Sequence, residues 1–236
     1  MRSLTPGILI NRFPGDPLYE FILKEGYLPI TCPLTINQFN KDLPSQLNTH
    51  LSEHKDIDAW ILTSPTVSRF IEPYIPQGTH LITTMASLDA LKKRDKFNFT
   101  VSDDPSSEAL VDLIRKIKPE GGNYLLLHGQ RSRYEIENSL INTQIRIWTL
   151  ITHTEIANDQ LSSIPFAGAY IALSPLQAEL FCQNAVGLFP IGWGKLVERT
   201  FIKKGLIDYK VCEPNLLALH TLLKFLYRKG HNDSQV

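Results

Sequence analysis

Residues 59–65 read AWILTSP, and residues 169–175, about 110 positions later, read AYIALSP. Each stretch is an apolar run that ends in Ser-Pro and leads into an amphipathic segment. A continuous apolar run is typical of a parallel strand covered by helices on both faces. A serine followed by proline is typical of a helix start. Both stretches therefore predict a buried strand followed directly by a helix.

Two further pairs of segments recur at a similar spacing. Residues 8–12 read ILINR and residues 124–127 read YLLL, while residues 108–110 read EAL and residues 217–219 read LAL. The three pairs follow the same order in both halves of the chain. This pattern predicts a duplicated unit of about 110 residues.

Short apolar runs alternate with amphipathic segments along the whole chain. Strands are expected at residues 8–12, 28–32, 58–63, 79–83, 97–101, 123–128, 145–151, 169–173, 187–191 and 208–212. Helices are expected at residues 17–25, 43–54, 65–73, 86–94, 106–117, 132–142, 175–184, 194–204 and 214–229. Asp16, Ser64, Asp104 and Ser174 each precede a proline at the start of an expected helix, as an N-cap residue does. The alternation predicts doubly wound, flavodoxin-like α/β units with parallel sheets.

The composition is that of an ordinary folded protein of one large domain or two smaller ones. Of the 236 residues, 43% are hydrophobic and 20% are charged, with 24 basic and 24 acidic side chains. A protein that binds nucleic acid through its phosphates usually has a basic excess, so no nucleic-acid partner is expected. The N-terminal residues lack an apolar signal segment, and no run reaches the roughly 20 apolar residues that span a bilayer. A cytoplasmic protein that does not bind membranes is expected.

The cysteines and histidines indicate no metal site. Cys32, Cys182 and Cys212 show no CxxC spacing and lie in apolar contexts, so buried thiols in a reducing compartment are expected. His50 and His54 are four positions apart, but their neighbours indicate an exposed helix face. The chain contains no GxSxG, Walker A or GxGxxG motif. A metal centre, a nucleophilic triad and a nucleotide loop are therefore not expected.

Polar residues follow several of the expected strands directly. They are Arg12, Thr63, Ser64, Arg131, Arg133 and Ser174. In an open α/β sheet, ligands bind beyond the carboxyl ends of the strands, where helix N-termini and arginines favour anions. Some of these residues also have simpler explanations, since the two serines are suitable N-caps and Arg131 and Arg133 can belong to a solvated loop, whereas a large cation such as Arg12 is less expected directly after a strand. The sequence leaves both interpretations open.

A series of weak motifs in one order resembles the uroporphyrinogen-III synthase family. The motifs are ILINRFP at 8–14, the segment 25–34, WILTSP at 60–65, SSEAL at 106–110, LLLHGQRSR at 125–133 and the glycine-bounded helix 194–205. Together they extend from about residue 7 to residue 228.

The resemblance implies a particular domain arrangement and reaction. Two α/β domains, residues 1–35 with 155–236 and residues 36–154, would be joined by a two-stranded linker. The family is a lyase of porphyrin biosynthesis that cyclises hydroxymethylbilane, with inversion of the D ring and loss of water. It uses no metal or organic cofactor, and this function needs only a monomer.

The resemblance also implies site residues. Carboxylates of the substrate would be bound by Arg12, Thr63, Ser64, Ser87, Arg131, Arg133, Ser174 and Gly194. His153 stands where the family often has a tyrosine that is proposed to donate a proton to the departing hydroxyl group, and a histidine with a pKa near 6.5 could do the same. Residues 84–87 keep a hydroxyl but lose the glycine of the family's GxxTA turn, and the second copy of that turn has Val197.

Two other functions are consistent with this sequence. One is a two-domain binding protein that has kept the cleft but lost catalysis. The other is a sugar- or amino-acid-binding protein of the periplasmic type, against which the missing signal segment argues. Isomer III formed from hydroxymethylbilane would separate the synthase from both.

Overall fold

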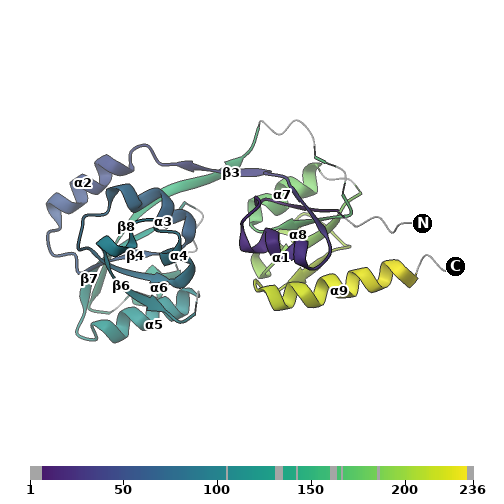
Figure 1. Cartoon of the computed structure of the whole chain (residues 1–236). Coiled ribbons are helices and arrows are strands. Elements are labelled where there is room, and N and C mark those ends of the chain that lie inside the picture. The colour runs from purple at the N-terminus through teal and green to yellow at the C-terminus, as the bar shows by residue number, and fades with distance from the viewer. Residues whose placement is uncertain are drawn as a thin grey trace. The chain divides into compact units, whose positions relative to one another are not determined.

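The chain forms two compact α/β units in a computed structural model (Figure 1). The structure describes residues 7–104, 106–130, 135–141, 143–159, 164–165, 167–184 and 187–232. The first unit comprises Met1–Ile36 with Ile156–Val236, and the second comprises Asn37–Glu155. Each unit has its own hydrophobic core on both faces of its sheet.

The first unit contains a five-stranded parallel sheet with the order β11-β10-β9-β1-β2. Its strands are β1 (Gly7–Ile10), β2 (Leu28–Thr31), β9 (Ala169–Ala172), β10 (Phe189–Trp193) and β11 (Lys210–Cys212). Its helices are α1 (Pro17–Lys24), α7 (Pro175–Asn184), α8 (Lys195–Lys203) and α9 (Leu216–Asn232). Apolar residues of α1 and α9 pack on one face of the sheet, and those of α7 and α8 pack on the other.

The second unit contains a six-stranded sheet with the order β3-β8-β7-β4-β5-β6. Its strands are β3 (Thr35–Phe39), β4 (Ala59–Leu62), β5 (His80–Thr84), β6 (Asn98–Ser102), β7 (Gly122–Gly129) and β8 (Ile145–Ala157). Its helices are α2 (Leu43–Glu53), α3 (Pro65–Ile71), α4 (Met85–Asp89), α5 (Ser107–Ile117) and α6 (Glu135–Leu140), with 3₁₀ turns at Glu72–Tyr74 and Arg94–Lys96. Residues of α2, α3 and α4 cover one face, and residues of α5 and α6 cover the other.

The two sheets have the same strand order when the sequence repeat is taken into account. The order is β2-β1-β9-β10-β11 in the first unit and β8-β7-β4-β5-β6 in the second. Strands β7 and β8 take the places of β1 and β2, and β4, β5 and β6 take the places of β9, β10 and β11. Each half of the chain thus supplies strands to both units. This is the flavodoxin-like order, so the predicted fold class is confirmed.

The strands β3 and β8 connect the units, and both differ from the sequence prediction. The two strands are the two-stranded linker that the family resemblance implied, but β3 is absent from the strands expected from apolar runs, because its residues are mostly exposed and polar. Strand β8 continues six residues beyond the predicted end at residue 151. Main-chain hydrogen bonds of 2.9 Å, from Asn40 to Thr152 and from Asn158 to Leu34, lie at the two ends of this pairing. The pairing of the two strands, rather than an apolar pattern, creates this part of the sheet.

Most expected helix starts are confirmed. The side chains of Asp16, Ser64 and Ser174 accept main-chain hydrogen bonds of 2.9, 3.3 and 3.2 Å from the first turns of α1, α3 and α7. The prediction that Asp104 is an N-cap was wrong, because Ser106 is the N-cap of α5. The side chain of Asp104 instead accepts a hydrogen bond from the Ser106 N–H. The helix expected at 86–94 ends at Asp89.

Other sequence expectations need correction at single residues. Cys32 and Cys212 are buried free thiols as expected, but Cys182 is only half-buried. His50 and His54 do not form an exposed face, since Nδ1 of His50 is buried and the His54 ring stacks on Trp148 at 4.3 Å between centroids.

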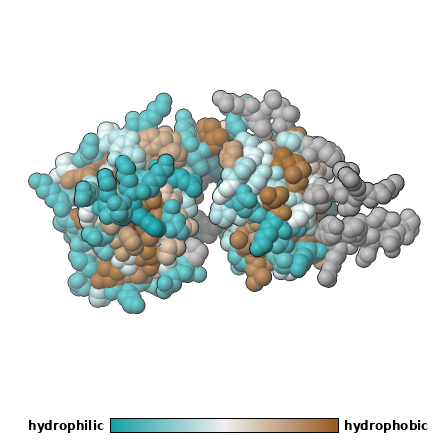
Figure 2. All heavy atoms as spheres, in the orientation of Figure 1, coloured by the Kyte–Doolittle hydropathy of each residue, from teal (hydrophilic) through white to brown (hydrophobic). Residues whose placement is uncertain are grey.

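The surface carries no single large apolar area on the face shown in Figure 2, where hydrophilic and hydrophobic side chains are mixed on both units. Ile207 and Leu217 are the most exposed large hydrophobic residues among those described, at 95% and 76%. Scattered apolar side chains of this kind are ordinary on a protein surface. None of the helices in the described part of the chain is both long and apolar enough to cross a bilayer.

Candidate functional site

Arg12, Ser174 and Gly194 lie at the carboxyl edge of the first sheet. They directly follow or closely follow β1, β9 and β10, which are neighbours in that sheet. The order of the strands changes direction between β1 and β9, and ligands of open α/β sheets bind at such a switch point. The structure therefore brings these three residues together at the expected place in this unit.

Arg12 is held by its own loop. Its Nε lies 3.3 Å from a carboxylate oxygen of Asp16, and its Nη1 donates a 2.8 Å hydrogen bond to the main-chain oxygen of Asn11. The side chain is still 42% exposed. A guanidinium group has five N–H donors, so donors remain available for an anion while the ion pair holds the group in place.

A buried polar network that the sequence analysis missed supports the β1–β9 switch point. The side-chain amide of Asn11 donates to Thr35 Oγ1 at 2.9 Å, and Gln177 Nε2 donates to the same oxygen at 3.1 Å. Gln177 also accepts a 3.0 Å bond from the Leu173 N–H. The sequence did contain a signal for the role of Gln177 at the start of α7, because Ser174 and Gln177 have the spacing of a capping box.

Gly194 contributes through its backbone conformation. Its φ of +86° is unfavourable for any residue with a Cβ, and it is the N-cap of α8. Its N–H donates a 2.8 Å bond to the Cys212 carbonyl. Gly194 therefore sets the position at which α8 begins, and its own N–H is already used.

Thr63, Ser64 and His153 lie at the carboxyl edge of the second sheet. They come from the ends of β4 and from β8, with β7 between these strands. The hydroxyl of Thr63 donates to the Leu127 carbonyl at 3.2 Å. The hydroxyl of Ser64 accepts from Val67 N–H and has no acceptor for its hydrogen among the described residues. Ser64 can thus donate a hydrogen bond to a ligand, while the hydrogen of Thr63 is already used inside the sheet.

Ser87 does not fit its predicted role. Its side chain is fully buried, and its hydroxyl is hydrogen-bonded to Thr84 Oγ1 at 2.9 Å at the start of α4. A hydroxyl in this position completes a helix start and does not reach a ligand. The family resemblance assigned Ser87 to carboxylate binding, but the residue is buried at the start of α4.

His153 is buried at the end of the second sheet, with 9% of its surface exposed. Its ring lies against Phe70 of α3, with 5.4 Å between centroids. Its Nδ1 lies 2.8 Å from the Thr152 hydroxyl, and Nε2 has no hydrogen-bond partner among the described residues. Burial lowers the pKa of this imidazole below its ordinary value, because the charged form loses solvation. The value near 6.5 that the sequence suggested is therefore too high.

The remaining candidates are outside these two groups. Arg131 and Arg133 lie outside the described residues. No group of three or more metal-ligating side chains occurs in the described part of the chain.

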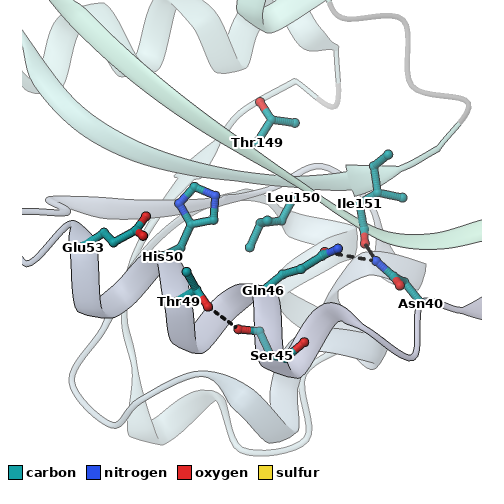
Figure 3. Close-up of a pocket in the computed structure, with 9 residues that line it drawn as sticks. All are labelled: Asn40, Ser45, Gln46, Thr49, His50, Glu53, Thr149, Leu150 and Ile151. Atoms are coloured by element: carbon teal, nitrogen blue, oxygen red, sulfur yellow. Dashed lines mark hydrogen bonds between the residues drawn. The ribbon is translucent and has the colours of Figure 1, made fainter.

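A separate cavity of about 550 Å³ lies in the second unit between α2 and β8 (Figure 3). Side chains of α2, including Gln46, His50 and Glu53, line one wall, and residues 149–151 of β8 line the other. The cavity contains none of the predicted site residues and borders the middle of β8.

Comparison with known proteins identifies the family. Residues 16–167 match the sequence profile described as "Uroporphyrinogen-III synthase HemD". The chain belongs to the uroporphyrinogen-III synthase family. The match includes α3 and the whole of β4, β7 and β8, and therefore all of the candidate residues at the edge of the second sheet.

Solved structures support the fold over nearly the whole chain. A mutant uroporphyrinogen III synthase from the extremely thermophilic bacterium Thermus thermophilus is 15% identical, with a TM-score of 0.56, covering 97% of this chain and 100% of that one. The synthetase from Helicobacter pylori is 14% identical, with a TM-score of 0.54, covering 94% and 100%. At such low identity these matches bear on the fold alone. No curated protein matches the sequence significantly.

Proposed function

We propose that this protein is a working uroporphyrinogen-III synthase that cyclises hydroxymethylbilane to uroporphyrinogen III, with inversion of the D ring and loss of water. Membership of the synthase family carries the proposal. The polar groups at the carboxyl edges of both sheets support it, because the substrate has many carboxylates and pyrrole rings but offers no group that needs a nucleophile or a metal.

Recognition of the substrate carboxylates is assigned to the exposed donors at these edges. Arg12 supplies guanidinium donors held by Asp16, and Ser64 supplies a hydroxyl hydrogen. Ser174 starts α7 and Gly194 starts α8, each at the positive end of a helix, where negative charge is favoured. Thr63 stabilises the adjoining ends of β4 and β7. Arg131 and Arg133 follow β7 in the sequence and complete the assigned set.

His153 is assigned to proton transfer at Nε2. The pyrrole nitrogen expels the hydroxyl group of the substrate, and a proton from the imidazolium converts it to water. Ring closure with inversion joins the new methylene group to the substituted α-carbon of the D ring, and the bond from that carbon to its old methylene bridge breaks. The old bridge then bonds to the free α-carbon of the same ring, which releases a proton that can return to the neutral imidazole. No proton is gained or lost overall, so one buried histidine can serve both steps. Its lowered pKa makes the imidazolium a stronger acid, although a smaller fraction of the protein carries it at neutral pH.

Binding of the substrate also contributes to the reaction. Holding the two ends of a flexible linear tetrapyrrole in one geometry replaces an improbable encounter with a local one. All of the assigned groups belong to one chain, so we expect a monomer to be sufficient.

A coupled assay tests the function. Freshly generated hydroxymethylbilane is added to the purified protein, the products are oxidised, and uroporphyrin isomers I and III are separated by chromatography. Dominant isomer III, absent with heat-denatured protein, is expected. Isomer I alone, at the spontaneous ratio, would overturn the proposal, and binding of uroporphyrinogen without turnover would then indicate a binding protein.

A further inference from the structure

The imidazole of His153 is placed by an irregularity in the pairing of β7 with β8. His128 pairs with Ile151, but the next residue, Gly129, pairs with His153. Thr152 is therefore an extra residue in β8, which makes a β-bulge. Side chains alternate between the faces of a regular strand, so the extra residue reverses which face the following side chains occupy. The bulge brings the His153 ring over Gly129 and against Phe70 of α3.

The hydroxyl of Thr152 lies within hydrogen-bond distance of a main-chain oxygen and of a histidine ring nitrogen. It is 3.2 Å from the main-chain oxygen of His128 and 2.8 Å from Nδ1 of His153. A carbonyl oxygen only accepts. Both contacts are hydrogen bonds only when Thr152 donates to His128 and accepts from an Nδ1–H of His153. This arrangement selects the neutral tautomer with hydrogen on Nδ1 and a lone pair on Nε2.

Nε2 lies close to the backbone of Gly129. A Cβ at position 129 would approach Nε2 to 2.8 Å and Cε1 to 2.9 Å. Gly129 does not have a positive φ, so its backbone does not require glycine. The requirement is instead for space: only a residue without a side chain lets the ring occupy this position.

We propose that Thr152 is a positioning residue that holds His153 as the Nδ1–H tautomer, so that Nε2 exchanges the proton with the substrate. The proposal rests on the proposed synthase function and adds to it the reacting atom and the residue that selects it. The charged groups that act on His153 are Glu155 on the same strand and His128 on β7, while α3 presents the uncharged ring of Phe70.

The first test measures the tautomer directly. Nitrogen-15 NMR of the histidine rings, with the His153 signals assigned by their loss in His153→Gln, should show a protonated Nδ1 and an unprotonated Nε2 above the pKa. Thr152→Val replaces the hydroxyl with a methyl group and should shift the neutral ring toward the Nε2–H tautomer. Thr152→Ser keeps the hydroxyl and should keep the parent signals. A parent ring protonated on Nε2, or no change in Thr152→Val, would overturn the proposal.

Kinetics provide a second readout. Thr152→Val should lower kcat about tenfold to a hundredfold, part of the roughly 10²-fold or more that a positioned proton donor contributes, with KM little changed. Thr152→Ser should restore most of the rate. Unchanged kcat in Thr152→Val, with the parent active, overturns the positioning role. No isomer III from the parent overturns the synthase function instead, whatever the NMR result.

A second variant tests the position of Nε2 even if Thr152→Val folds poorly. Gly129→Ala leaves the Thr152 hydroxyl in place, and the ring at the end of a side chain can move to relieve the contact. It should keep the Nδ1–H tautomer and the folded structure but lower kcat by displacing Nε2. Normal kcat in Gly129→Ala would show that the position of Nε2 has no role.

Discussion

The hydroxyl group of Tyr27 donates a buried hydrogen bond of 2.6 Å to the main-chain oxygen of Leu223, which lies 196 positions further along the chain. Tyr27 precedes β2, and Leu223 belongs to α9. The bond thus joins the N-terminal and C-terminal segments that together make the first unit. The same two segments share one core, in which Ile22 of α1 and Leu219 of α9 are fully buried.

Removing this hydroxyl should weaken the first unit. We predict that Tyr27→Phe lowers the free energy of unfolding by about 1 kcal/mol, the typical net contribution of one hydrogen bond. Urea denaturation followed by circular dichroism measures the change. Tyr74→Phe is the matched control, because Tyr74 is 37% exposed and its ring stacks on Phe39 in the second unit. Equal stability of the two variants would contradict the prediction.

The second unit should fold alone. Both of its cores are built from residues within 43–150, so a fragment of residues 37–155 is predicted to unfold cooperatively and to give dispersed NMR signals. A fragment of residues 156–236 should not fold, since it lacks β1 and β2. Strand β1 is paired on both sides in the parent sheet. A disordered 37–155 fragment would show that this unit depends on the other.

The hydroxyl of Ser64 offers a test of carboxylate binding that is separate from helix capping. Aspartate caps helices as well as serine does, so Ser64→Asp should retain stability. Its negative charge should repel a substrate carboxylate and raise KM by about tenfold, which is 1.4 kcal/mol. Ser106→Asp is the control, since Ser106 caps α5 in the same way with a 3.2 Å bond from Ala109 N–H. An equal KM in both variants would remove Ser64 from the site.

The lowered pKa of His153 predicts two pH effects. The donor is the protonated ring, so the part of kcat that depends on His153 should fall as pH rises through a pKa below 6.5. His153→Gln should lose that dependence.

Stability should change in the opposite direction. A folded-state pKa below the unfolded value stabilises the protein above about pH 6.5, and this contribution is lost as pH falls through the folded value. The parent should therefore lose more stability than His153→Gln between pH 7.5 and 5 in thermal unfolding. A parallel loss in both proteins would show that another group is responsible.

Local sequence was sufficient to predict those strands and helix starts that depend on neighbouring residues alone. The apolar runs of β4 and β9 lie in the centres of their sheets, and Ser64 and Ser174 cap the helices that follow. Such patterns need only the residue itself and its next few neighbours. The polar strand β3 had no such pattern, because its residues are ordered by pairing with β8.

The candidate site was predictable only in part. Placement of Arg12, Ser64 and Ser174 at strand ends follows from the order of strands and helices. The hydrogen-bond partner of each hydroxyl group does not follow from that order. Ser87 is buried against Thr84, and Thr63 donates to the main-chain oxygen of Leu127 on a neighbouring strand. Those contacts join residues whose separation is set by packing.

The sequence by itself determined the buried strands, most helix starts and the repeat, because periodicity and capping act over a few residues. The family resemblance implied that the two halves exchange strands between units, but only the tertiary structure showed that Tyr27 meets Leu223. It also decided that an extra residue in β8 places His153 over Gly129. The physical reason is that strand partners and register depend on main-chain hydrogen bonds between distant segments, which no local pattern records.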